Sequence, residues 1–323
     1  MNGPAILKAA ALACLFAAGP SHAITYELVT VGDPGNASDD TSFGAVDYVY
    51  RIGKYEVSIG QYTAFLNAVA ATDTYGLYNG NMGGIPNVAG ISRAGSDGSY
   101  TYAVIDNGGS SANRPVTSAS WFSAARFANW MSNGQPTGAQ DATTTEDGAY
   151  PVSGATTGNA VARNAINPNT GAPPAFLIPL ENEWYKAAYY DPTANGGAGG
   201  YFTFATRSDT LPGNLVGDDP NQANYLSEET GYSVNQSPVF STSQPYLTDG
   251  GAFSASPGAY GTFDQTGNVW EWNDLDGAPG YSRGLRGGAY TSTPPYLQSS
   301  YRMGYGADRF NPNGGFRLAS PAE

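Results

Sequence analysis

The sequence predicts a loop-rich fold that mixes a few helices with short strands in a single domain. Helix signals with clear caps occur at only three places, and the extended apolar runs between them are short. The chain of 323 residues also contains 43 glycines and 22 prolines, which favour turns. Loops of such length are unusual in a compact domain unless they bind something or are held by ions, and they are predicted at 71–113, 132–172 and 192–260.

Three helices are predicted from capping residues followed by apolar residues at helical spacing. The first begins after Ser58, which has the spacing of a capping box to Gln61. The second begins after Ser120 and stops at an Asn-Gly pair, and the third follows Pro179 and stops at an Asp-Pro pair. Short extended segments are predicted at 48–52, 175–178, 268–272 and 315–318.

The N-terminal 23 residues have the features of an export signal. Lys8 precedes the apolar run 9–18, and small residues stand at Ser21 and Ala23. We therefore expect cleavage near Ala23, a mature single domain of residues 24–323, and a secreted or periplasmic location. A buried N-terminal helix is the alternative, but the run is too short to span a bilayer. No later run approaches the roughly 20 apolar residues of a membrane helix, so we expect no transmembrane segment in the mature chain.

The composition excludes several classes of function. The only cysteine, Cys14, and the only histidine, His22, both lie within the predicted signal. The mature chain thus has no thiolate nucleophile, no imidazole catalyst, no disulfide and none of the usual ligands for zinc, copper or non-haem iron. The net charge is −13. An acidic surface repels phosphates, so we expect no nucleic acid partner.

Six short blocks occur in an order that resembles the formylglycine-generating enzyme, or sulfatase-modifying factor, family. They are YRIGKYEV at 50–57, RPVTSASW at 114–121, IPLENEW at 178–184, GNVWEW at 267–272, LRGGAY at 285–290 and GFRL at 315–318. The resemblance spans residues 26–320 and implies an α+β fold. This fold is the formylglycine-generating-enzyme variant of the C-type lectin fold, loop-dominated and with bound calcium.

The catalytic positions of the family are replaced in this chain. Catalytic members use two cysteines that bind copper and oxidise a substrate cysteine. The resemblance places Ser292 at the first position, Gln298 or Ser300 at the second, and Ala289 at the active-site serine. Neutral hydroxyls and amides cannot replace two thiolates at a Cu(I) site, so we expect no copper and no formylglycine generation. A related branch holds iron with histidines, which this mature chain lacks.

The family's calcium positions are retained. The resemblance assigns a calcium site to Asp264, Gly267, Val269 and Glu271. This set would supply two carboxylates and two main-chain carbonyls, which are the hard ligands that calcium prefers. In the alternative interpretation Asp264 caps a turn and Glu271 pairs with an arginine such as Arg286 or Arg302.

Other charged positions have structural explanations. Asn224 and Tyr225 are expected to begin a second calcium site, whose acidic ligand the sequence does not identify. Glu181 and Glu183 stand at the start of the third predicted helix, where the helix dipole favours them. Pairing with buried carboxylates is expected, rather than ligand contact, for Arg286, Arg302 and Arg317.

The groove of the catalytic members is expected to remain as a binding surface rich in tyrosine and serine, which make adaptable contacts. Its predicted residues are Trp270, Tyr290, Ser292, Tyr296, Gln298, Ser300, Tyr301 and Arg302. Core packing is the alternative role for at least one of the tryptophans Trp270 and Trp272. The leading hypothesis is an exported, calcium-stabilised, non-catalytic protein of the bacterial envelope. Its ligand would be a peptide, another protein or a glycan.

Two further hypotheses stay open. The first is an enzyme that uses carboxylates alone, drawn from Asp264, Glu271, Asp274 and Asp276. Residues that bind calcium are poorly suited to that role. The second is a structural envelope component in which the groove is vestigial.

Overall fold

The structure is a computed structural model that describes residues 23–322. The signal peptide predicted for 1–23 lies outside the described residues except for Ala23. The helices are α1 Ile59–Val69, α2 Asn81–Gly84, α3 Trp121–Ser132, α4 Glu181–Tyr189, α5 Ala194–Gly197 and the 3-10 turn η1 Pro294–Leu297. The strands are β1 Leu28–Val31, β2 Tyr50–Gly53, β3 Ile91–Ala94, β4 Thr101–Val104, β5 Tyr190–Asp191, β6 Gly200–Tyr201, β7 Leu226–Ser227, β8 Gly231–Tyr232, β9 Trp270–Asn273, β10 Ser282–Arg286, β11 Met303–Gly306, β12 Gly314–Gly315 and β13 Ala319–Pro321.

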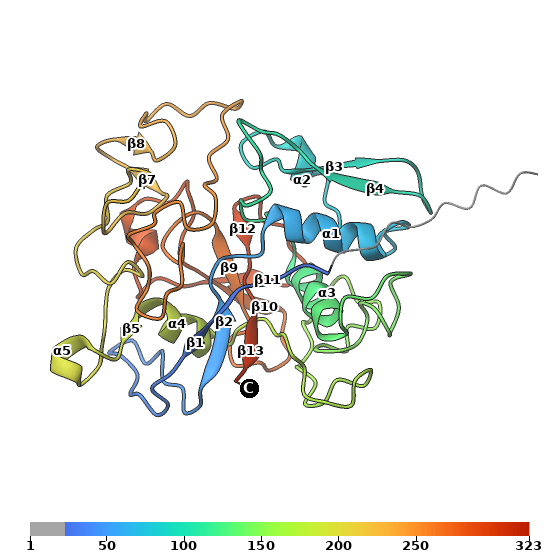
Figure 1. The fold of residues 1–323 in the computed structure, drawn as a ribbon, viewed down its shortest axis with the longest axis horizontal. Coiled ribbons are helices and arrows are strands. Elements are labelled where there is room, and N and C mark those ends of the chain that lie inside the picture. The colour runs from blue at the N-terminus through green and yellow to red at the C-terminus, as the bar shows by residue number, and fades with distance from the viewer. Residues whose placement is uncertain (1–22, 323) are drawn as a thin grey trace, which may run out of the picture.

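Two small sheets form the centre of the domain (Figure 1). In the first, β2 lies between β1 and β13 and is antiparallel to both. In the second, the order is β11-β10-β9-β12, and only β12 runs parallel to its neighbour. Figure 1 shows α1, α3 and the β3–β4 hairpin on one side of these sheets and the loops of 192–260 on the other. The predicted loop-rich α+β architecture is confirmed.

The three predicted helices form where their caps indicate. The Ser58 hydroxyl accepts from the Gln61 amide at 3.2 Å, and the Gln61 side chain accepts from the Ser58 amide at 2.9 Å, so the capping box starts α1. Ser120 caps α3 in the same way through the amide of Ser123. At α4, the Glu183 carboxylate accepts from the Leu180 amide at 2.6 Å, which explains an acidic residue in the first turn.

The predicted strands are only partly correct. Segments 48–52 and 268–272 overlap β2 and β9, but 175–178 forms no strand. It contributes a single antiparallel bridge, in which Leu177 and Ala319 exchange two backbone hydrogen bonds. The prediction of a loop at 71–113 is wrong in part, because this segment contains α2 and the β3–β4 hairpin. The strands of the hairpin are too short for their alternating pattern to be recognised in the sequence.

The main core joins the helices to the C-terminal segment. The rings of Phe65 in α1 and Phe127 in α3 lie 5.2 Å apart, and Phe127 lies 5.5 Å from Phe316. Tyr62 stacks on Phe127 at 5.9 Å and donates to the carbonyl of Leu77. Such aromatic pairs bury large apolar surfaces, so this cluster fixes α1 and α3 against the C-terminal block 315–318.

Candidate functional site

The turn before β9 brings the two segments predicted to bind calcium into contact. Asp264 and Gly267 have φ angles of 63° and 86°, and the turn passes directly beside Asn224. A Cβ atom on Gly267 would lie 2.1 Å from the Asn224 carbonyl oxygen. Glycine is therefore required at 267. The backbones of segments 224–225 and 264–271 pack directly against each other.

Glu271 is fully buried and is occupied by protein groups. Arg317 donates Nε to one oxygen and Nη2 to the other, both at 2.6 Å, and the Trp184 indole donates to the carboxylate at 2.8 Å. Arg317 also donates to the carbonyls of Gly53, Lys54 and Phe263. The arginine alternative therefore describes Glu271, although its partner is Arg317 and neither Arg286 nor Arg302.

Asp264 has a different environment, close to a second buried carboxylate. Its Oδ2 accepts from the Gly251 amide at 2.7 Å, and burial raises the pKa of Asp264 to about 6. Burial, and then the negative charge of Asp264, raise the pKa of Glu56 well above its usual value. Glu56 lies in the block at 50–57 and was not predicted as a site residue. The available signal was an acidic residue that stands between Tyr55 and Val57 in the sequence.

Asn224 and Tyr225 are engaged with the chain itself. The Asn224 side-chain amide donates to the carbonyl of Tyr246 at 2.9 Å and to Oδ1 of Asn268 at 3.1 Å. The Tyr225 hydroxyl donates to the carbonyl of Pro212 at 2.6 Å. This hydrogen-bond network ties the loop around 246 to the turn before β9.

The fit of calcium to these residues is uneven. Arg317 already supplies the positive charge that calcium would bring to Glu271, whereas Asp264 carries a single hydrogen bond on one oxygen. Within residues 23–322 no group of three or more His, Cys, Asp or Glu side chains could hold a metal ion. The predicted set uses two carboxylates and two carbonyls, so this finding does not decide it, and calcium binding stays a prediction.

Two of the predicted groove residues belong to the interior. The ring of Tyr290 stacks on Tyr246 with 5.6 Å between centroids and 5° between planes. Tyr246 in turn lies 4.4 Å from Tyr232, which fixes the long loop against the core. The Ser292 hydroxyl accepts from the Ala289 amide at 2.9 Å. Ser292, which the resemblance places at the first catalytic cysteine, therefore stabilises its own backbone turn.

The remaining groove residues form a partly exposed aromatic cluster, which we call the η1 cluster and define as Trp270, Tyr296 and Tyr301. Tyr301 lies 5.7 Å from Trp270 and 4.8 Å from Tyr296. Trp270 is 8% exposed and Tyr296 is 42% exposed, so the cluster runs from the core to the surface. Gln298 and Ser300 lie beside Tyr301 on the same turn, the former partly buried and the latter exposed. The indole of Trp272, by contrast, is fully buried.

Glu181 fixes the turn that carries this cluster. Its carboxylate accepts from Arg286 at 2.8 Å and, through both oxygens, from Arg302 at 2.8 and 2.6 Å. Arg286 also donates to the carbonyls of Ser299 and Tyr301. The predicted pairing of Arg286, Arg302 and Arg317 with buried carboxylates is therefore present in the structure.

The carboxylates of the hypothetical carboxylate-only enzyme do not share an open site. Glu271 and Asp274 are each fully buried against arginines, and Asp274 lies 2.7 Å from Arg283 and 3.2 Å from Arg163. Asp276 is exposed on the loop that follows β9. Burial raises the pKa of Asp274, and the charges of Arg163 and Arg283 act in the opposite direction. Asp274 is therefore paired with arginines and does not face a second carboxylate across an open site.

A cavity of about 560 Å³ reaches the start of η1 but is not lined by the three residues of the η1 cluster. Pro294, at the start of η1, lines it together with Leu211, Leu215 and Tyr225. Leu211 and Leu215 are about half exposed, and acidic residues Glu228 and Glu229 stand at the same cavity. The aromatic cluster and this cavity therefore flank one short turn.

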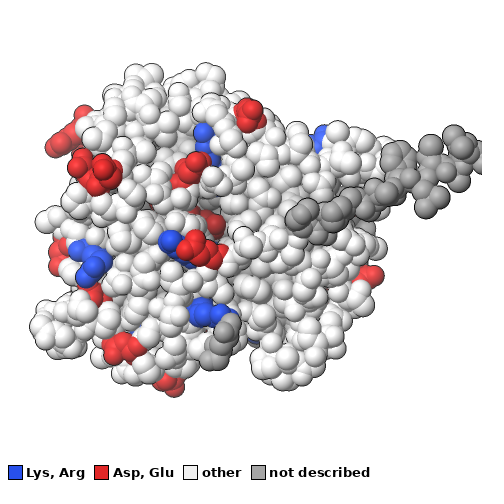
Figure 2. Space-filling model, in the orientation of Figure 1, with Lys and Arg blue, Asp and Glu red and all other residues white. Residues whose placement is uncertain are grey.

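The charged side chains on the face seen in Figure 2 lie scattered in small groups, with Lys and Arg mixed among Asp and Glu. No broad basic area is visible on that face. None of the helices within residues 23–322 combines the length and apolar character needed to cross a membrane.

Comparison with family models matches residues 38–322 to the sulfatase-modifying factor enzyme 1-like domain. The chain belongs to this family of formylglycine-generating-enzyme-like proteins. The family fold accounts for the few helices and the small sheets. The resemblance assigns the two catalytic cysteine positions to Ser292, which accepts from the Ala289 amide, and to Gln298 or Ser300, which lie beside the η1 cluster.

Solved structures similar to this family member have low sequence identity. CarF shares 20% identity with a TM-score of 0.49, covering 93% of this chain and 99% of its own. Treponema denticola variable protein 1 shares 18% with a TM-score of 0.49, covering 92% and 95%. PvdO from Pseudomonas aeruginosa shares 16% with a TM-score of 0.44, covering 92% of each chain. A search of curated proteins finds no match.

Proposed function

We propose that this family member is an exported, non-catalytic binding protein whose ligand contacts the η1 cluster and the cavity at the start of η1. The observation that carries the proposal is how the side chains are arranged in residues 289–301, the segment that holds the cysteines in catalytic members. Ser292 is committed to the Ala289 amide, while Tyr296 and Tyr301 present a partly exposed aromatic surface a few residues later. Aromatic side chains that are already held in place bind partners at a low entropic cost.

The turn is prepared for binding because its support is buried. Buried Arg286 donates to the carbonyls of Ser299 and Tyr301, and it also donates to the Glu181 carboxylate. A ligand therefore meets a surface whose backbone needs little ordering. The side chain of Arg302 is 47% exposed and remains available to an acidic or hydroxyl-bearing ligand at the rim.

The binding proposal is tested with immobilised peptide and glycan arrays probed by the mature chain. Substitution Tyr296→Ala with Tyr301→Ala should abolish the strongest signals. Phe310→Ala is the matched control, because Phe310 is 39% exposed and lies outside the cluster and the cavity. Equal loss in the control, or retention of all signals in the double variant, would exclude the cluster as the ligand site.

A second assay separates binding from catalysis. The mature chain is incubated with copper, oxygen and a cysteine-containing peptide, and aldehyde formation is followed by mass spectrometry. We expect no aldehyde, because the thiolates that hold Cu(I) in catalytic members have no counterpart in residues 24–323. Aldehyde formed in a copper-dependent way would overturn the non-catalytic assignment.

Export is proposed on the contacts of the predicted mature N-terminus. The Ile24 amide donates to the Gln135 side chain at 2.7 Å, and the Gln135 amide donates back to the Ile24 carbonyl at 3.0 Å. The chain is therefore anchored from its first predicted mature residue. N-terminal sequencing of the protein recovered from a bacterial periplasm or medium should begin at Ile24, and an intact N-terminus recovered only from the cytoplasm would refute export.

A further inference from the structure

The cavity of about 560 Å³ at the start of η1 is lined by exposed leucines. Leu211 is 46% exposed and Leu215 is 53% exposed, whereas every other leucine within residues 23–322 is buried or partly buried. Pro212 and Pro294 line the same cavity. Apolar side chains at a concave surface leave contact with water when a ligand covers them, so this cavity favours an apolar group.

The two segments that form the cavity are held to each other by buried hydrogen bonds. Asn214 is 4% exposed; its Nδ2 donates to the Gly231 carbonyl at 2.7 Å, and its Oδ1 accepts from the Thr230 hydroxyl at 2.6 Å. The Tyr225 hydroxyl donates to the Pro212 carbonyl at 2.6 Å. The cavity is therefore formed before a ligand arrives, and binding needs little ordering of the backbone.

Two exposed carboxylates stand at the same cavity without a cation of the chain beside them. Glu228 and Glu229 occupy the turn between β7 and β8, a hairpin that Figure 1 shows at the periphery of the domain. None of the ion pairs within residues 23–322 includes either of them. Among the described residues, no Lys or Arg lines the cavity. A ligand that covers the cavity therefore meets two carboxylates that are free to pair with it.

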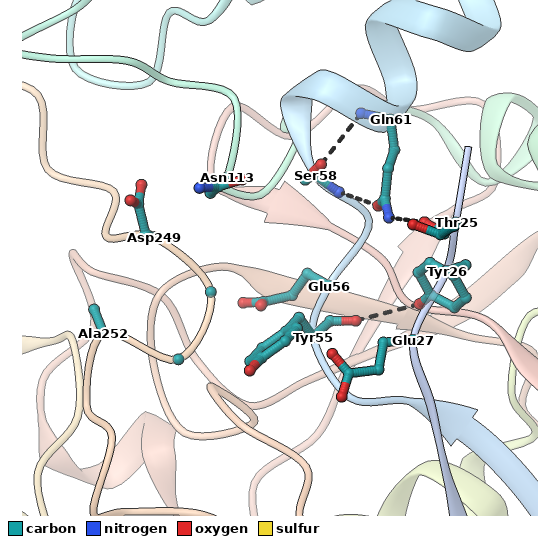
Figure 3. A pocket seen from close by; sticks show the side chains of 12 residues that line it. Thr25, Tyr26, Glu27, Tyr55, Glu56, Ser58, Gln61, Asn113, Asp249 and Ala252 are labelled. Atoms are coloured by element: carbon teal, nitrogen blue, oxygen red, sulfur yellow. Dashed lines mark hydrogen bonds between the residues drawn. The ribbon is translucent and has the colours of Figure 1, made fainter. Parts of the chain in front are cut away.

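A second cavity, of about 550 Å³, has the opposite arrangement (Figure 3). Figure 3 shows Glu27 and Asp249 on different sides of it. Lys54 lies 2.8 Å from Glu27 and Arg114 lies 3.9 Å from Asp249, so each of these carboxylates has a cation of the chain close to it. No leucine lines this second cavity in the described part of the chain. Exposed leucines combined with unpaired carboxylates thus distinguish the cavity at η1 from this one.

These surroundings discriminate between classes of ligand. The hydroxyl groups of a glycan would be buried against leucine side chains without hydrogen-bond partners, which costs free energy. An apolar side chain of a peptide has no such cost. The two carboxylates repel an acidic peptide, and a neutral peptide would remove water from them without supplying a compensating charge. A basic peptide supplies that charge.

We propose that the cavity at the start of η1 receives an apolar side chain of a basic peptide segment, whose adjoining Lys or Arg pairs with Glu228 and Glu229. The inference rests on the proposed function and names its ligand as a polypeptide, because Pro294 joins this cavity to the turn that carries Tyr296. The basic residue of the ligand lies at the cavity end. Arg302, which follows the η1 cluster in the sequence, is left for an acidic or hydroxyl group elsewhere in the same ligand.

The test is a selection of random peptides displayed on phage against the mature chain, followed by calorimetry of the enriched peptides at physiological ionic strength. We expect the enriched sequences to combine a net positive charge with a large apolar residue next to Lys or Arg. Raising the salt concentration should weaken their binding, because exposed charge pairs are screened. Enrichment of neutral or acidic sequences, or of no sequence, overturns the proposal.

Charge variants test the role of the two carboxylates. Glu228→Gln combined with Glu229→Gln should weaken binding of the enriched peptides about three- to tenfold, the effect expected when two exposed charge pairs are lost. Glu228→Lys combined with Glu229→Lys should select acidic peptides in place of basic ones. Glu27→Gln is the matched control, because Glu27 is an exposed carboxylate at the second cavity, and it should change binding less than about twofold. Equal loss in the control would mean a general effect of the acidic surface and would overturn the assignment.

An apolar variant tests the role of the leucines. Leu215→Ser should weaken binding about fivefold, because a side chain that is already half buried gains only part of the free energy of full burial. Ile166→Ser is the control, since Ile166 is 52% exposed against 53% for Leu215 and lines neither cavity. Both variants should keep the melting temperature of the wild type, because surface substitutions change stability little. Equal binding by the two variants overturns the assignment.

The double variant Tyr296→Ala with Tyr301→Ala separates this inference from the proposed function. If the enriched peptides lose binding in that variant but not in the Glu228, Glu229 and Leu215 variants, the η1 cluster binds a ligand and the cavity assignment is wrong. If the peptides depend on Glu228, Glu229 and Leu215 alone, the cavity assignment stands and the cluster is not part of the ligand site.

Discussion

Arg317 and Glu271 form a bidentate ion pair at the centre of the domain, and both side chains are fully buried. The pair joins the block at 315–318 to β9, and Arg317 extends it to the carbonyl of Gly53 at the end of β2. One side chain therefore links both sheets. Because a buried pair depends on both charges, loss of one partner leaves the other charge uncompensated.

Arg317→Met should lower the free energy of unfolding by about 3–5 kcal/mol, the range for breaking a buried pair. Urea denaturation at pH 7 measures it. Lys54→Met is the control, because the Lys54–Glu27 pair is at the surface and contributes at most about 1 kcal/mol. Similar losses in the two variants would mean that Arg317 acts through something other than its buried charge.

Gly267→Ala should be more destabilising than a glycine substitution that meets only backbone strain. Gly35 has nearly the same φ, 83° against 86°, but a Cβ there meets nothing within 4 Å. Gly35→Ala should cost about 1–2 kcal/mol from the left-handed conformation alone. Gly267→Ala adds a clash with the Asn224 carbonyl and should cost about 1–3 kcal/mol more. Equal costs in thermal unfolding would show that the 224 segment can move away freely.

Asp264 predicts a specific pH dependence of stability. Its pKa is about 6 in the folded protein, mainly through burial, against roughly 4 in an unfolded chain. Between these values the folded state holds the proton more tightly, so this group makes stability decrease as pH rises from about 4 to about 6. The loss approaches about 3 kcal/mol when Asp264 is fully ionised.

Chemical denaturation of the wild type and of Asp264→Asn, at several pH values in calcium-free buffer, measures this contribution together with the effect of Asp264 on Glu56. The difference in unfolding free energy between the two proteins should favour the variant increasingly from pH 4 to pH 7. A difference that is constant with pH would mean that Asp264 titrates normally.

Calcium should stabilise the domain if the turn before β9 binds it. Chelation should lower the melting temperature, and added calcium should restore it. Free calcium at one hundred times the dissociation constant should raise the free energy of unfolding by about 2.7 kcal/mol. Magnesium and the Asp264→Asn variant are the controls. If chelation has no effect on the wild type, the Arg317–Glu271 pair alone holds this region and the calcium prediction is wrong.

Local signals were enough to predict the three longest helices, α1, α3 and α4, but not the short α2, α5 and η1. Ser58 and Ser120 cap α1 and α3 through atoms within three residues of each other, so the sequence contains the whole interaction. The 175–178 segment was mispredicted because it forms only a single bridge, between Leu177 and Ala319, and no ladder of strand hydrogen bonds. A short apolar run does not distinguish these two outcomes.

The site depended on contacts across the whole chain. The sequence predicted that Glu271 either binds calcium or pairs with an arginine. Only the structure identifies Arg317 as that arginine, because it places the C-terminal block against β9. Tyr290 and Ser292 were expected in a groove, whereas Tyr246 and Ala289 hold them inside. Glu56 was missed because Asp264 and Asn268, the groups that act on its carboxylate, are remote in sequence.

The arrangement of the first sheet also determines when the molecule can fold. Strand β2 requires β1 on one edge and β13 on the other, so residues near 30 and near 320 must meet before the sheet is complete. A chain still emerging from the ribosome lacks β13 and Arg317, and closure over such a separation is slow. The first sheet should therefore stay incomplete until synthesis ends. This would suit the export proposed above, because a chain without that sheet can still pass through a narrow translocation channel and complete its fold on the far side.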